Sequence, residues 1–160
     1  VTDQGKAAIV EGRSGSVIGI DGWSSGVHTW EVAVESLELK RGAFWWAVVG
    51  VSLDGVPCEG PGSFHIKGRT FGHRLDADPD LCFSLGVAQG KPFKIKSTMA
   101  RIRLSLDNKA GTLTVSDVLA PSSSLTIRIP MSKRLYPWAH LVGKGTSIRF
   151  IGEGEHRSAN

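Results

Sequence analysis

Apolar and polar residues alternate along several short stretches of the chain. In residues 28–34, Trp30, Val32 and Val34 alternate with Thr29 and Glu31. A period of two directs one set of side chains into a core and the other toward water. The same alternation recurs in residues 100–106, 125–129 and 135–141. The pattern predicts β-strands in all four stretches.

Residues 44–52 are apolar at nearly every position, which predicts a central strand covered on both faces. Strands are also predicted at 112–116, after a hairpin turn at 107–111, and at 147–151, paired with 135–141 through Gly143 and Gly145. Residues 35–41 are too short for a stable helix and are expected to form a loop or strand end. Weaker strand candidates are residues 7–10, 16–20, 63–67, 70–75, 83–87 and 92–95.

About a dozen short strands without long helices predict an all-β fold, a twisted antiparallel β-sandwich. A parallel α/β fold is excluded because its crossovers need helices. The 160 residues suit one domain. We expect residues 16–151 to form the sandwich, residues 1–15 an extension that packs on it, and residues 152–160 a tail. Val1 in place of methionine indicates a piece of a longer protein.

Charge and cysteine content narrow the function only slightly. The net charge of +4 permits contact with nucleic acid or an acidic surface without requiring it. Two cysteines, Cys58 and Cys82, are too few for a disulfide framework and indicate reduced thiols in an intracellular protein. No apolar stretch is long enough to span a membrane.

Three patterns with catalytic or metal-binding associations lack their structural context. Gly22 to Gly26 fits G-x-S-x-G, but a strand follows where a nucleophile elbow needs a helix. The acidic run from Asp76 to Asp80 lacks the glycine and glutamate of a calcium loop. The five histidines show no zinc-ligand spacing. We therefore expect no catalytic residue, no metal and no cofactor.

Five motifs occur in an order that resembles the SPRY domain family. Residues 25–34 (SGVHTWEVAV) are similar to its S-G-x-H-x-W-E-V-x-V segment, and residues 47–51 (AVVGV) to the strand that follows. Residues 107–115 (DNKAGTLTV) resemble its D-x-x-x-G-T-L-x-F hairpin, residues 135–137 (LYP) a late strand and residues 148–150 (IRF) the last one. The resemblance spans about residues 16–151.

This resemblance implies a β-sandwich without an active site that recognises proteins. Such domains occur inside larger intracellular proteins, among them ubiquitin-ligase substrate receptors, scaffolds, chromatin and RNA-processing factors and ion channels. Binding would use loops at one end of the sandwich and the outer face of one sheet. In this chain the corresponding loops are residues 12–16, 52–62 and 143–145.

The residues themselves indicate a similar region. In residues 135–141 the inward set leaves Trp138 and His140 on the other face, and an exposed tryptophan is a typical interface anchor. Arg13 and Lys144 are cations in glycine-flanked loops, which can approach a partner closely. The predicted partner-binding residues are Arg13, Ser14, Asp54, Val56, Pro57, Trp138, His140 and Lys144.

Two alternatives stay open at this point. A basic face of Lys94, Lys96, Arg101 and Arg103 could follow an RNA backbone, although no aromatic residues alternate with these cations to stack bases. A carbohydrate-binding sandwich rests on fold analogy alone. The preferred prediction is a monomeric, non-catalytic domain of a cytoplasmic or nuclear protein that binds a peptide or loop of a protein partner and no membrane.

Overall fold

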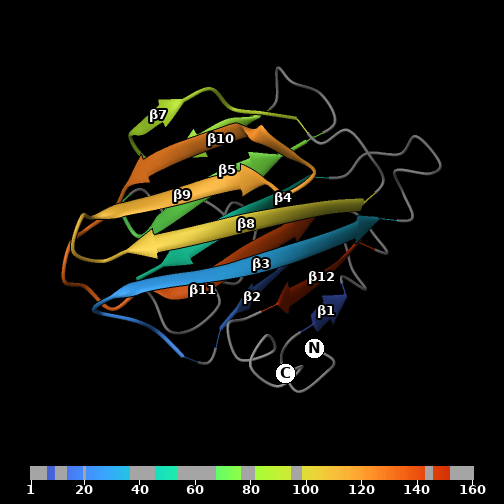
Figure 1. The fold of residues 1–160 in the computed structure, drawn as a ribbon. Coiled ribbons are helices and arrows are strands. Elements are labelled where there is room, and N and C mark those ends of the chain that lie inside the picture. The colour runs from blue at the N-terminus through green and yellow to red at the C-terminus, as the bar shows by residue number, and fades with distance from the viewer. Residues whose placement is uncertain are drawn as a thin grey trace, which may run out of the picture.

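The computed structural model describes residues 7–9, 14–19, 21–36, 46–53, 68–76, 82–94, 99–142 and 146–151. Side chains are described at these positions except at 7–9, 14–15, 35–36, 46, 99–100 and 146. The described residues form twelve strands in two antiparallel sheets (Figure 1). None of them lies in a helix that is long and apolar enough to cross a membrane.

The larger sheet has seven strands, and its outer face is turned toward the viewer in Figure 1. Its edges are two short strands of three residues each, and its centre is the longest pairing, between the third and eighth strands of the chain. In spatial order the strands are β1 (Ala7–Ile9), β12 (Thr146–Ile151), β3 (Val27–Ser36), β8 (Met99–Asp107), β9 (Thr112–Asp117), β10 (Ala120–Arg128) and β7 (Ala88–Gly90).

The smaller sheet has five strands and lies behind the larger one in Figure 1. In spatial order these are β2 (Ser14–Ile18), β11 (Tyr136–Val142), β4 (Trp46–Ser52), β5 (Thr70–Leu75) and β6 (Phe83–Leu85). The central place of β4, with residues 47–52 all buried, confirms the strand predicted from the continuous apolar run.

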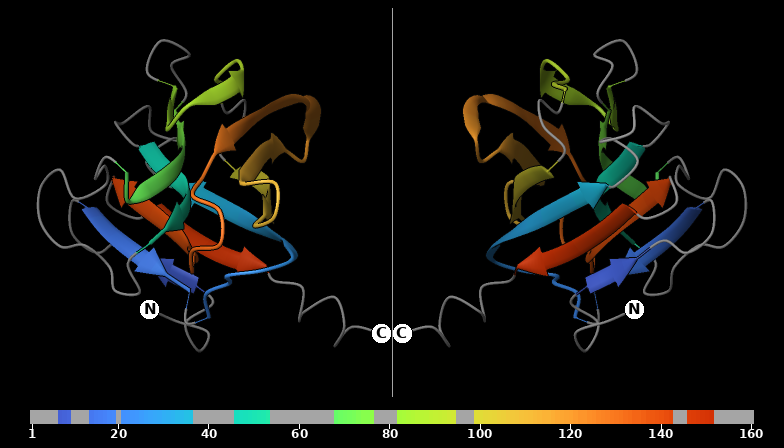
Figure 2. Two further views of the ribbon diagram at one scale, coloured as in Figure 1. Left: turned by 90° about the vertical axis from the view of Figure 1, so that its left-hand side faces the viewer. Right: turned by 90° about the vertical axis from the view of Figure 1, so that its right-hand side faces the viewer.

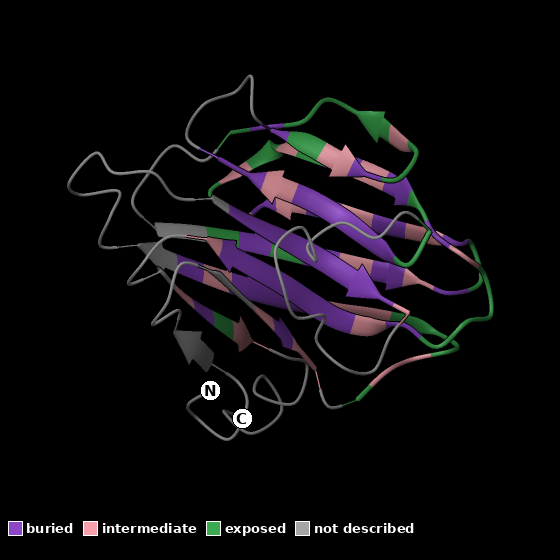
Figure 3. Ribbon diagram, turned by 180° about the vertical axis from the view of Figure 1, so that it is seen from behind, coloured by how far each residue is buried: buried purple, intermediate pink, exposed green. Residues whose placement is uncertain are grey.

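The core lies between the two sheets, where alternate side chains of each strand meet. Trp30, Val32 and Val34 of β3 face Ala47, Val49 and Val51 of β4 across this layer, within one cluster of buried side chains. Seen from behind, buried residues run along the central strands, and exposed residues gather at the turns and at β7 (Figure 3). The period of two in the sequence therefore gives the inward-facing set correctly.

Two strand predictions are wrong. The predicted hairpin between 135–141 and 147–151 does not form, because β11 pairs with β2 and β4, whereas β12 pairs with β1 and β3. The chain crosses from one sheet to the other after Val142. Residues 92–94 form no strand; the strand in this region is β7, which pairs with β10. The candidate at 63–67 lies outside the described residues.

The predicted domain boundaries stay predictions. Within the stretch expected to be an extension, residues 7–9 pair with β12 and Ser14 opens β2, so the described parts of residues 1–15 belong to the two sheets.

Candidate interaction surfaces

Most of the partner-binding residues predicted in loops lie outside the described part of the chain. Ser14 is described by its backbone alone and opens β2. The predicted residues for which the structure gives no account are Arg13, Asp54, Val56, Pro57, Lys96 and Lys144.

The three predicted binding loops do not begin at one end of the sandwich. Ser14 pairs with Val142, so the start of β2 lies beside the end of β11. Ser52 pairs with Tyr136, at the opposite end of β11. Six residues of extended strand separate these points, about 20 Å. The strand ends that adjoin the predicted loops therefore lie at two different ends of the sandwich, contrary to the expectation.

Trp138 is buried, which corrects the prediction of an exposed anchor. Its exposed fraction is 1%, although its side chain does lie on the face away from the main core, as the alternation indicates. Trp138 shares a row across the smaller sheet with Gly50, Gly72 and Leu85. With Val48 and Leu85 it forms a second buried cluster. Its outer face is thus covered rather than open to a partner.

His140 is also buried, with an exposed fraction of 4%. Its Nδ1 shares a hydrogen bond of 2.7 Å with Ser16 Oγ of β2. Burial lowers the pKa of His140 to about 4, because the protonated ring would lose its hydration. The imidazole is therefore neutral at physiological pH and is not a surface contact as predicted.

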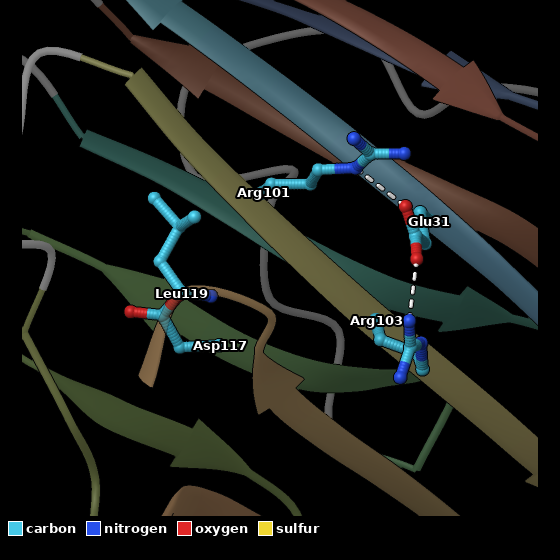
Figure 4. Close-up of polar contacts among 5 residues, drawn as sticks. All are labelled: Glu31, Arg101, Arg103, Asp117 and Leu119. Carbon is cyan, nitrogen blue, oxygen red and sulfur yellow. Dashed lines mark hydrogen bonds and ion pairs between the residues drawn. The ribbon is translucent and has the colours of Figure 1, made fainter. Parts of the chain in front are cut away.

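The arginines predicted to bind RNA share one carboxylate. Arg101 Nε lies 2.5 Å from Glu31 Oε2, and Arg103 Nη2 lies 2.8 Å from Glu31 Oε1 (Figure 4). The three residues lie on the outer face of the larger sheet, where Glu31 of β3 is opposite Arg103 of β8. Glu31 thus balances part of the positive charge that a phosphate backbone would use.

The two arginines also lower the pKa of Glu31. Burial opposes its ionisation, but the hydrogen bonds from Arg103 and Arg101 and their charges outweigh that effect, so the pKa lies below its ordinary value. Lys94 is exposed but does not extend this cluster, because it follows Phe93, whose backbone bonds to His73 of β5. The structure brings together two of the four predicted RNA-binding residues.

His73 is a fully buried polar residue that sequence reasoning left unassigned. Its Nδ1 lies 3.1 Å from Phe83 O and its Nε2 lies 3.3 Å from Phe93 N. A neutral ring that donates from Nδ1 to Phe83 O can accept at Nε2 from Phe93 N, and the same Nε2 lies 3.1 Å from Phe93 O. Burial lowers the pKa of His73 and favours this neutral form. The histidine joins the segment around Phe93 to the smaller sheet and serves the fold.

Exposed apolar side chains gather at one end of the larger sheet, which neither the motifs nor the predicted loops indicated. Val27, Asp107, Thr112 and Arg128 pair in one row across four strands, and Arg128 N donates to Val87 O at 2.8 Å. The exposed fraction is 61% for Val27 and 73% for Val87. This row is the left-hand end of the sheet in Figure 1 and faces the viewer in the left panel of Figure 2.

Met131 adds a third apolar side chain to this end, with an exposed fraction of 62%. It lies against the turn between β8 and β9, since a Cβ built on Gly111 would be 2.6 Å from Met131 Cγ. Four exposed cations accompany these three residues. We call this surface the rim and define it as Val27, Val87, Lys109, Arg128, Met131, Lys133 and Arg134.

Backbone hydrogen bonds hold the segments of the rim together. Asn108 N donates to Gly26 O at 3.1 Å, and Ile129 N donates to Gly111 O at 3.0 Å. Asp107 Oδ1 accepts bonds from the backbone of Lys109 and Ala110 and so closes the turn. The positive φ of 68° at Gly111 is a conformation that glycine adopts without strain. These bonds fix the backbone that carries the exposed side chains.

The charge of the rim is positive. Lys109, Arg128, Lys133 and Arg134 form no ion pair with another described residue. Asp107 lies in the same row, and its Oδ1 accepts two backbone hydrogen bonds of the turn. A local signal existed in the sequence, because Met131 stands beside Lys133 and Arg134 in a polar connection. Neighbouring residues in the sequence could not predict that Met131 lies at the same end of the sheet as Val27 and Val87.

The described residues offer little metal or thiol chemistry. No group of three histidine, cysteine, aspartate or glutamate side chains among them could hold a metal ion. Cys82 is a buried free thiol whose Sγ lies 3.5 Å from Asp76 O. Ser24, the serine of the G-x-S-x-G pattern, is exposed in the bend that leads into β3.

This architecture is similar to that of solved SPRY domains. The SPRY domain of human HERC1 superposes with a TM-score of 0.69 at 17% sequence identity, covering 96% of this chain and 92% of that domain. The TRIM65 PSpry domain gives a TM-score of 0.63 at 20% identity, covering 86% of this chain and 70% of that one. No protein-family model and no curated protein matches the sequence. The two antiparallel sheets, their strand order and this likeness together establish that the chain has the fold of the SPRY domains.

Proposed function

We propose that this domain is a non-catalytic protein-interaction module that binds a short peptide or loop of a partner at the rim. The observation that carries the proposal is that Val27, Val87 and Met131, all more than 60% exposed, lie along one end of the sandwich. Single exposed apolar residues are ordinary, but three that alternate with polar residues along one end of a sheet can contact one extended partner. The proposal includes the host protein that the SPRY resemblance implies, which is an intracellular ubiquitin-ligase receptor or scaffold.

The local structure supports binding at the rim rather than catalysis there. The backbone of its turns is fixed by internal hydrogen bonds, so little ordering is needed when a partner docks. Apolar side chains surrounded by cations supply desolvation and charge contacts, the usual components of a recognition surface.

An unbiased peptide library displayed on phage tests the proposal. We expect the domain to select binding peptides, and Met131→Asp to weaken those peptides at least 10-fold without changing the melting temperature. Leu119→Asp is the matched control, because Leu119 is 72% exposed in the turn between β9 and β10, at the other end of the sheet. Peptides that bind the Met131 variant as tightly as the unchanged domain would reject the rim as the binding site.

A further inference from the structure

We infer that the rim takes an extended acidic segment that carries apolar residues; this inference rests on the proposed function and names the chemistry of its partner. The sequence resemblance points to other loops, residues 12–16, 52–62 and 143–145. No residue of the rim lies in these three loops.

The dimensions of the rim suit an extended segment. Val27 and Val87 stand at the two ends of a row that crosses four strand intervals. At about 4.8 Å per interval, the row is about 19 Å long, which six residues of extended chain span. Met131 lies over the turn between β8 and β9, between these ends. An extended segment laid along the row would contact all three apolar side chains.

Charge complementarity identifies the character of that segment. Arg128 lies within the row, Lys109 in the adjoining turn, and Lys133 and Arg134 follow Met131. The row from Val27 to Val87 contains one carboxylate, that of Asp107, and its Oδ1 already accepts two backbone hydrogen bonds. Carboxylates of a bound segment would pair with the free cations, and like-charged segments would be repelled.

A peptide fits the rim better than a nucleic acid does. Proteins that bind single-stranded nucleic acids stack the bases on aromatic side chains. The apolar residues of the rim are valine and methionine instead. A phosphate backbone would use the cations but leave the three apolar side chains exposed. The apolar and the basic residues are used together only by a segment that contains both apolar and acidic residues.

Three fluorescein-labelled probes test the inference by anisotropy: an eight-residue peptide alternating leucine with glutamate, its counterpart alternating leucine with lysine, and an octauridine RNA. We expect the glutamate peptide to bind at least 10-fold tighter than the lysine peptide, with a difference that shrinks in 0.5 M salt. Arg128→Glu and Met131→Asp should each weaken the glutamate peptide at least 10-fold.

The controls are matched in charge and in exposure. Arg149→Glu makes the same charge change on the outer face of the same sheet, three rows of side chains from Val27, and should leave binding unchanged. Leu119→Asp controls for the apolar change. Equal binding of the glutamate and lysine peptides would overturn the inference, as would tighter binding of the RNA that depends on Arg128 but not on Met131.

The two proposals fail in different ways. If library peptides bind at the rim but are not enriched in acidic residues, the inference about the partner is wrong and the proposed binding site stands. If no selected peptide depends on Met131, both are wrong.

Discussion

Glu31 holds two arginines of the neighbouring strand on an otherwise solvent-facing sheet. Its side chain is 9% exposed, whereas the Arg101 and Arg103 side chains are about half exposed. The carboxylate is the more buried partner, so its removal would leave two like charges side by side. The stability of this part of the sheet therefore depends more on Glu31 than on either arginine.

Glu31→Gln should lower the free energy of unfolding by about 1–2 kcal/mol at pH 7, because two charge-assisted hydrogen bonds are lost. The native pKa of Glu31 is below its ordinary value of 4.5, so its contribution is present above pH 4.5 and disappears as the pH falls through the lower native value. Urea unfolding at pH 7 and pH 3 measures this. Asp21→Asn at an exposed position should change stability by less than about 0.5 kcal/mol; equal losses in both variants would contradict the role of Glu31.

His140 also lowers stability as the pH falls, but over a higher pH range than Glu31. Its pKa is about 4 in the folded domain, against an ordinary 6.5. Between these values the unfolded chain binds a proton that the native state does not, so stability is complete above pH 6.5 and falls as the pH decreases toward 4.

His140→Gln should therefore show a smaller loss of stability between pH 7.5 and pH 5 than the unchanged domain, measured as the shift of the urea midpoint. Val48→Ala is the control, since Val48 is buried opposite His140 and does not titrate. It should lower both midpoints by a similar amount. A pH dependence that His140→Gln leaves unaltered would disprove the contribution of this ring.

Strand β11 shows at the level of the element why alternation alone misassigned two residues. In a two-layer sandwich the outward side chains of a strand normally meet water. The outer face of the smaller sheet is an exception, because Val48, Leu85 and Trp138 are all at most 1% exposed there. Gly50 and Gly72 between them lie in close contact, since a Cβ on Gly50 would be 1.9 Å from Phe71 O.

Trp138→Ala should lower the free energy of unfolding by about 3–5 kcal/mol, the usual cost of truncating a buried aromatic residue. Thermal unfolding followed by near-UV circular dichroism checks this, with Leu119→Ala as an exposed control that should have almost no effect. An unchanged melting temperature in the tryptophan variant would show that the indole is dispensable for packing and return it to the candidates for binding.

The two corrections to the strand predictions have one physical origin. A local pattern specifies that a segment is extended and which side chains share a face, but not which distant strand becomes its neighbour. Residues 135–141 and 147–151 are close in sequence with glycines between them, and yet β11 and β12 join different sheets. Pairing across the chain depends on how all inward faces pack together, which no short window contains.

For the whole molecule, the periodicity of the sequence was sufficient to predict the fold class, and the order of motifs to predict the SPRY architecture that the solved structures match. The candidate site was not predictable in the same way. Val27, Val87 and Met131 are more than 40 residues apart in sequence, and each alone is an unremarkable surface residue. Only the register of five strand segments brings them to one end of the sheet.

The pairing of β1 with β12 places Ala8 opposite Ile148, so the first and last strands that the structure describes are immediate neighbours. A surface loop of a host polypeptide would need to open by little more than one strand spacing, about 5 Å, to carry the whole sandwich as an insert. The same closeness makes circular permutation feasible, because a short linker could join these segments while new ends are cut elsewhere.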